Sequence, residues 1–102
     1  MLDPRMTKLA ELLVRHSMRV QSGEKVLVEA FDIPSEMTVA LVRAVADVGG
    51  HPIVSTYQQP VLRALYQHAT AEQMQTIGAI ERARMEAVQC YVGMREIGRA
   101  HV

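Results

Sequence analysis

Residues Lys25-Val-Leu-Val-Glu-Ala-Phe31 decide the fold. The run is short, mostly apolar, and bounded by Gly23 before it and by Asp32-Ile-Pro34 after it. A run of this kind is typical of a strand that is covered on both faces, as strands of a parallel sheet are. We therefore expect a strand over residues 25–31.

Helical patterns stand on both sides of this strand. Asp3-Pro4 predicts a helix start, because Asp3 can accept a bond from the first free N–H groups and proline has no N–H to satisfy. A second helix follows Pro34 and ends at Gly49-Gly50, where a glycine can take the left-handed conformation. A second strand over Pro52–Tyr57 completes the strand, helix, strand crossover that a parallel pair requires.

Two more helices and a strand complete the pattern. Pro60 opens a third helix, and Thr70-Ala-Glu-Gln73 is a capping box that begins a fourth. Val88–Gly93 reads as a third strand. The order αβαβααβ predicts an α/β domain with a small parallel sheet flanked by helices, whose strand order the pattern leaves open. Three strands are few for such a sheet, so either the chain oligomerises or part of the domain is missing.

Composition excludes several classes of protein. The 102 residues include 11 Lys and Arg, 11 Asp and Glu and one cysteine, with zero net charge. This balance disfavours a general nucleic-acid binder or a polybasic membrane protein. No apolar run reaches the roughly 18 residues of a membrane span. We expect a soluble, cytoplasmic protein without nucleic-acid or membrane partners.

Catalytic motifs are scarce. No Gly-x-Gly-x-x-Gly follows the first strand, and no Walker-type loop is present. None of the four histidines, His16, His51, His68 and His101, has a His or Cys partner at metal-ligand spacing. We interpret His51 as the entry to a strand and His68 as a residue near a helix C-terminus. Cys90 reads as a buried, inert thiol within a strand.

Two acidic residues flank the end of the first strand, the edge where open α/β sheets place ligands. Glu29 and Asp32 are candidates for such a site. The structural interpretation is a surface carboxylate for Glu29 and a helix cap for Asp32, which stands just ahead of Ser35. Met6, Met37, Met74 and Met85 occur at helical spacing and are predicted to fill the core.

A longer ordered set of segments resembles one known family. The segments are Met1–Arg5, Lys8–Val14, Gly23–Pro34, Ala40–Arg43, Gly49-Gly50, Val61–Tyr66, Ala71–Met74, Glu81–Glu86 and Tyr91–Arg95. In this order they closely resemble the N-terminal part of the thermophilic-type metallo-aminopeptidases, the aminopeptidase T-like family. The resemblance extends from the start of the chain to Arg95, although no single segment is a catalytic signature.

The resemblance implies a larger enzyme that removes N-terminal residues from peptides. In that family a pair of divalent metal ions, zinc or cobalt, would activate water and polarise the peptide carbonyl. Carboxylate, histidine and tyrosine ligands in a C-terminal domain hold the ions. The resemblance therefore assigns no catalytic or metal-binding residue to this chain, leaves the substrate-binding residues unknown, and implies that the chain alone is inactive and binds no metal. It also implies a homodimer when the protein is complete.

The end of the chain departs from the family pattern. Ile97-Gly-Arg-Ala-His-Val102 matches the translation, up to a stop codon, of a widely used short-read sequencing adapter. We therefore expect residues 1–95 to be a partial N-terminal α/β domain, incomplete relative to the family's, and residues 96–102 to be a non-native tail. The alternative for this segment is an ordinary short basic tail.

A second function of another class stays open. The chain can be a stand-alone α/β module that binds a small ligand or a partner chain. Its binding region would be the strand edge around Glu29–Ile33, where parallel sheets place ligands.

Overall fold

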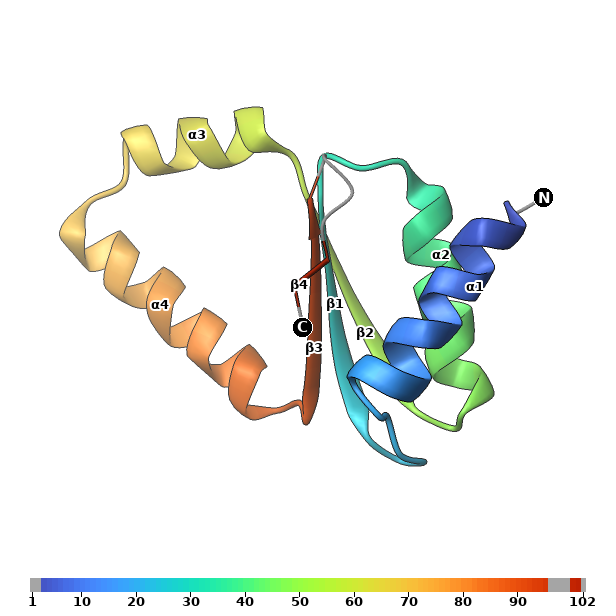
Figure 1. The fold of residues 1–102 in the computed structure, drawn as a ribbon. Coiled ribbons are helices and arrows are strands. Elements are labelled where there is room, and N and C mark those ends of the chain that lie inside the picture. Colours follow the sequence, from blue (N-terminus) through green and yellow to red (C-terminus); the bar gives the residue numbers. More distant parts are fainter. Residues whose placement is uncertain (1–2, 96–99, 102) are drawn as a thin grey trace.

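The computed structural model describes residues 3–95 and the backbone of residues 100–101. The helices are α1 (Pro4–Leu12), the π-helix η1 (Leu13–Ser17), α2 (Ser35–Asp47), α3 (Gln59–Gln67) and α4 (Ala71–Glu86). The strands are β1 (Lys25–Phe31), β2 (His51–Tyr57), β3 (Cys90–Arg95) and β4 (Ala100–His101). Helices α1 and α2 lie on one face of the sheet, and α3 and α4 lie on the other (Figure 1). The α/β class and the predicted order of helices and strands are confirmed.

The sheet has the strand order β2-β1-β3-β4. β1 pairs in parallel with β2 from Lys25↔His51 to Phe31↔Tyr57, and with β3 from Val26↔Cys90 to Phe31↔Arg95. The first strand of the sequence is therefore central, with neighbours on both sides. Its residues Val26–Ala30 are all buried, which confirms the expected cover on both faces.

The third and fourth strands differ from the prediction. β3 begins at Cys90, two residues later than the predicted Val88. β4 pairs antiparallel to β3 and was not predicted. Residues 96–99 and 102, which make up most of the predicted non-native tail, lie outside the described residues.

Local signals place the helix ends. Asp3 Oδ1 accepts a hydrogen bond of 2.8 Å from the N–H of Arg5, as the sequence predicts. The capping box of α4 is complete, with Thr70 and Gln73 each accepting from the other's backbone N–H. Gly49 ends α2 with a φ of +82°, a conformation that a glycine takes without steric cost.

The core lies between the sheet and α1–α2. Val26, Val28 and Ala30 of β1 pack there against Leu41 and Val45 of α2, and all five are buried. Met6 and Met37 contact the same cluster from its rim, as predicted.

Helices α3 and α4 have no buried residue. Met74 and Met85, predicted to fill the core, are exposed. The spacing of apolar residues identifies which side of a helix is apolar, but burial also requires a partner surface. Figure 1 shows both helices standing away from the sheet. In the part of the chain that the structure describes, no helix is long and apolar enough to cross a membrane.

Candidate functional site at the carboxyl edge of the sheet

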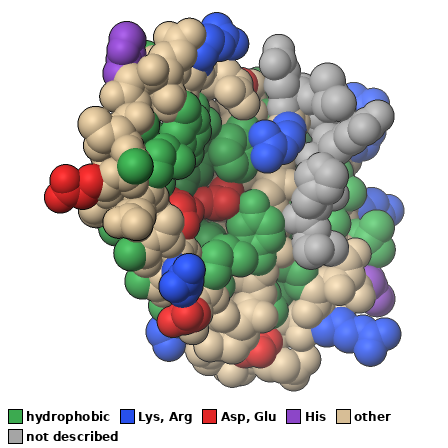
Figure 2. Space-filling view, turned by 90° about the vertical axis from the view of Figure 1, so that its left-hand side faces the viewer, with side chains coloured by type: hydrophobic (Ala, Val, Ile, Leu, Met, Phe, Trp, Pro, Cys, Tyr) green, Lys and Arg blue, Asp and Glu red, His purple; other side chains and the backbone are tan. Residues whose placement is uncertain are grey.

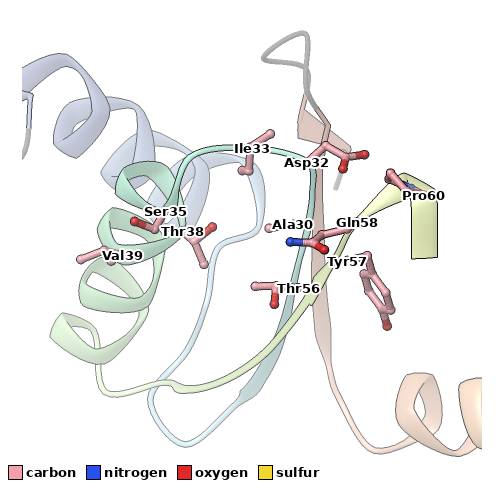
Figure 3. Close-up of a pocket in the computed structure, with 10 residues that line it drawn as sticks. All are labelled: Ala30, Asp32, Ile33, Ser35, Thr38, Val39, Thr56, Tyr57, Gln58 and Pro60. Atoms are coloured by element: carbon pink, nitrogen blue, oxygen red, sulfur yellow. The ribbon is translucent and has the colours of Figure 1, made fainter. Parts of the chain in front are cut away.

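The chain leaves β1 and β2 toward opposite faces of the sheet. β1 leads into α2 on one side, and β2 leads into α3 on the other (Figure 1). Open α/β sheets bind ligands in the crevice where such connections diverge. A cavity of about 510 Å³ lies at this edge. Its lining includes Ala30, Asp32, Ile33, Ser35, Thr38, Val39, Thr56, Tyr57, Gln58 and Pro60 (Figure 3).

Asp32 forms the turn that ends β1. Its φ of +56° is left-handed, a region that Asp tolerates better than most residues. Both carboxylate oxygens accept from the N–H of Gln59, at 3.0 and 3.2 Å, and its own N–H donates to the carbonyl of Tyr57 over 3.0 Å. Asp32 is thus a helix cap, as expected, but of α3 rather than of the helix that follows it in sequence. The left-handed turn directs its carboxylate to the end of β2.

The N-terminus of α2 lacks such a cap. Pro34 stands at the N-cap position and provides no side-chain hydrogen bond. Thr38, one turn into the helix, lines the cavity and is only 8% exposed. No residue that the structure describes forms a hydrogen bond with its hydroxyl group.

Glu29 faces the opposite side of the sheet, toward α4. It is 7% exposed, so the predicted surface carboxylate is wrong. The Tyr57 hydroxyl donates to Glu29 Oε2 over 3.0 Å, and Arg84 Nη2 of α4 lies 3.8 Å from the same oxygen. Glu29 is buried because it lies on the central strand, and these two groups compensate its charge.

Arg84 is only partly satisfied by this carboxylate. Its Nε and Nη2 atoms are buried and have no hydrogen-bond partner among the described residues. The 3.8 Å separation from Glu29 exceeds hydrogen-bond length. The pair is therefore an ion pair without a direct hydrogen bond.

Two tyrosines border Glu29, one on each neighbouring strand. Burial, followed by hydrogen bonding to Glu29, raises the pKa of Tyr91 to about 12. The same two causes raise the pKa of Tyr57. A Cβ atom at Gly93 would collide with the Tyr91 hydroxyl and lie 3.1 Å from Cζ. The glycine thus allows the Tyr91 ring to lie across its own strand.

Aromatic and basic side chains extend this face to the carboxyl ends of the strands. The Phe31 and Tyr57 rings stack with centroids 4.9 Å apart and an angle of 15° between their planes. The guanidinium carbon of Arg95 lies 4.5 Å from the Phe31 centroid, a cation–π distance. Figure 2 shows acidic side chains surrounded by hydrophobic ones on this side of the molecule.

His51 and Cys90 stand at the amino ends of their strands, away from this edge. His51 is exposed and is the first residue of β2, as the predicted strand entry requires. Cys90 is half-buried, and its Sγ lies 3.8 Å from Glu24 Oε1. Burial, with a smaller contribution from Glu24, raises the pKa of this thiol. Neither His51 nor Cys90 contacts Glu29 or Asp32.

Sequence reasoning missed Tyr57, Arg84 and Tyr91 as neighbours of Glu29. Period-2 alternation places Glu29 on the same face of β1 as Leu27 and Phe31. Finding its neighbours also requires the strand order and registers, which pair Glu29 with Ser55 and Gly93. Those pairings are long-range, so no short segment contains the signal.

The described residues contain no group of three or more His, Cys, Asp or Glu side chains able to hold a metal ion. A metal centre therefore has no fitting ligand set in this part of the chain, and no step of a metal-assisted reaction is assigned to its residues.

The sequence model of one family, described as thermophilic metalloprotease (M29), matches residues 2–95. The match covers nearly all of the described residues. No curated protein sequence matches the chain.

Proposed function

The chain belongs to the thermophilic metalloprotease family M29, and we propose that it is the N-terminal part of a metal-dependent aminopeptidase. Such an enzyme hydrolyses N-terminal residues from peptides with two divalent metal ions, zinc or cobalt. The observation that carries the proposal is the family match over residues 2–95. Peptide substrates, a homodimer and a cytoplasmic setting belong to the same proposal.

The contribution of these residues would be structural. On this proposal the metal ligands belong to another part of the protein. On this proposal the cluster around Glu29 stabilises the scaffold, and the 102-residue chain alone is inactive.

The test compares two polypeptides on aminoacyl p-nitroanilides, with zinc or cobalt present. One is the 102-residue chain. The other continues from Arg95 into the contiguous genomic coding sequence. We expect hydrolysis, abolished by a chelator, from the longer polypeptide alone. Metal-dependent hydrolysis by the 102-residue chain would overturn the site assignment, and an inactive longer polypeptide would overturn the aminopeptidase proposal.

A second candidate function is a small α/β module that binds a ligand at the carboxyl edge. The cavity of about 510 Å³ beside Asp32 and Ile33 favours it, because this is the edge where such sheets bind ligands. Saturable binding of a small molecule by the 102-residue chain would support this function. This second function is compatible with the aminopeptidase proposal, since a domain of an enzyme can carry a binding site of its own.

A further inference from the structure

Helix α4 turns a partly apolar side toward the sheet. Arg84 on that side lies 3.8 Å from Glu29 of the central strand. Ile80 and Ile77 share this side with Arg84, because residues four and seven positions apart lie on one side of a helix. Ile80 is nevertheless 55% exposed. The side of α4 that faces the sheet therefore keeps apolar surface that the described residues leave uncovered.

The sheet is also incompletely covered on this face. Ile53 of β2 pairs with Leu27 in the register, so its side chain lies on the same face as Glu29. It is 42% exposed. Figure 2 shows hydrophobic side chains around acidic ones on this side of the molecule. Both α4 and the sheet thus present exposed apolar side chains on the face of the Glu29–Arg84 ion pair. We call this region the α4–sheet face.

The topology of the sheet indicates which further segment would lie there. β1 connects to β2 through α2 on one face, and β2 connects to β3 through α3 and α4 on the other (Figure 1). These connections run in opposite directions across opposite faces, so they have the same hand, as parallel crossovers almost always do. A crossover from β3 to a parallel strand beyond it would continue in the direction of the second connection. The same hand then places its helix on the face of α3 and α4.

The outer edge of β3 has room for such a strand. β4 pairs there with Gly93 and Met94 alone. The order β2-β1-β3 is also the beginning of the order 2-1-3-4-5 of doubly wound sheets, in which the next parallel strand lies beside the third. Seven residues of this sequence follow Arg95, whereas a parallel crossover needs a dozen or more. The covering helix would therefore come from a continuation of the chain.

We propose that the α4–sheet face is the docking surface for the amphipathic helix that follows β3 in the longer protein. The apolar side of that helix contacts Ile80 and Ile53, and its polar side faces solvent. Docking removes water from around Glu29 and Arg84, which strengthens the attraction between their charges. The proposal rests on the proposed function in one respect, because it requires a chain that continues beyond Arg95. It does not require peptidase activity.

The experiment compares the 102-residue chain with the polypeptide that continues from Arg95 into the contiguous genomic coding sequence. Ile80→Cys is introduced into both, together with Cys90→Ser, which removes the native thiol. Alkylation of position 80 by iodoacetamide is followed by peptide mass spectrometry. We expect alkylation to be at least tenfold slower in the longer polypeptide, because the docked helix covers the thiol. Equal rates in the two polypeptides would overturn the proposal.

Gln75→Cys is the matched control on the same helix. Gln75 is exposed and lies nine residues before Arg84, which is about 2.5 helical turns and therefore the opposite side of α4. Its alkylation should be equally fast in the two polypeptides. Equal slowing at positions 75 and 80 would overturn the assignment of the docking surface to the sheet-facing side of α4.

A photo-crosslinker at position 80 identifies the occupant. The longer polypeptide carries Ile80→p-benzoylphenylalanine, and the crosslinked peptides are identified by mass spectrometry after irradiation. We expect crosslinks to the first helix after Arg95 within the same molecule. Crosslinks to a second copy, or to a segment beyond the strand that follows this helix, would overturn the crossover helix as the occupant.

These outcomes are distinct from those of the peptidase test. A longer polypeptide that protects position 80 but hydrolyses no aminoacyl substrate would retain the docking surface and remove the aminopeptidase proposal. An active longer polypeptide with an unprotected position 80 would do the reverse.

Discussion

The hydroxyl group of Tyr57 donates a hydrogen bond of 3.0 Å to Oε2 of Glu29, across 28 residues of sequence. Glu29 lies on the central strand and Tyr57 ends the strand beside it. With Tyr91 on the other neighbouring strand, the buried carboxylate has a phenol on each side. An ionised phenol next to this carboxylate would add a second negative charge, so the cluster requires protonated tyrosines.

This cluster predicts loss of stability at alkaline pH. The folded-state pKa of Tyr91 is raised from 10.0 to about 12. The contribution of Tyr91 to the free energy of unfolding is therefore complete below pH 10 and is lost as the pH rises through about 12. Urea unfolding between pH 8 and 12 should show a falling free energy of unfolding. Tyr91→Phe should flatten that fall, whereas Tyr66→Phe, at an exposed position on α3, should not. Parallel curves for the two variants would contradict the prediction.

Gly93→Ala should destabilise the chain by about 1–3 kcal/mol, a typical cost of overpacking. The new Cβ would displace the Tyr91 ring and separate its hydroxyl from Glu29. We expect a lower urea midpoint together with a lower pKa for Tyr91, measured by tyrosinate absorbance.

Gly78→Ala is the matched control for this change. A Cβ at Gly78 meets no atom within 4 Å, and the residue lies inside α4. Alanine favours a helix over glycine by about 0.5–1 kcal/mol, so this variant should be more stable. A loss of stability at position 78 as large as that at position 93 would contradict the steric explanation.

Substitutions at Asp32 should separate its two roles. Asp32→Ala removes the cap of α3, which should lower the free energy of unfolding by about 1 kcal/mol. It also leaves an alanine, without a compensating hydrogen bond, in the left-handed conformation at φ +56°, which should cost about 1 kcal/mol more. Asp32→Gly should lose only the cap, and Asp32→Asn should retain most of the stability. The predicted order in chemical denaturation is Asp, Asn, Gly, Ala. A more stable Asp32→Ala than Asp32→Gly variant would refute the cost assigned to the left-handed conformation.

Cys90 should react slowly with thiol reagents. Burial raises the pKa of its thiol, so less thiolate is present at pH 8 than in an unfolded chain. Modification by iodoacetamide should accelerate in urea. Glu24→Gln should also increase the rate in the folded chain, because it removes the smaller, coulombic cause. An unchanged rate in urea would mean that the fold does not protect the thiol.

The sequence predicts those features whose causes are local. The limits of β1, the Asp3 cap and the capping box at Thr70 depend on residues within a few positions of one another, and the structure confirms all three. The family resemblance likewise depended on short ordered segments, and the family match confirms it.

Features with distant causes could not be predicted in this way. The burial of Glu29 depends on the strand order, and the cap formed by Asp32 depends on where the next strand ends. The exposure of Met74 and Met85 depends on what lies opposite α4. In each case the residue type is compatible with both outcomes, and the tertiary arrangement selects one of them.

The central position of β1 also has a kinetic consequence. Its pairing with β2 closes over one helix, so Glu29 and Tyr57 are 28 residues apart. Its pairing with β3 closes over three helices and β2, and the contact of Lys25 with Gln89 spans 64 residues. Closing the shorter loop costs less chain entropy. Refolding should therefore protect the amide protons shared by β1 and β2 from exchange first, and β3 should be the last parallel strand to join them.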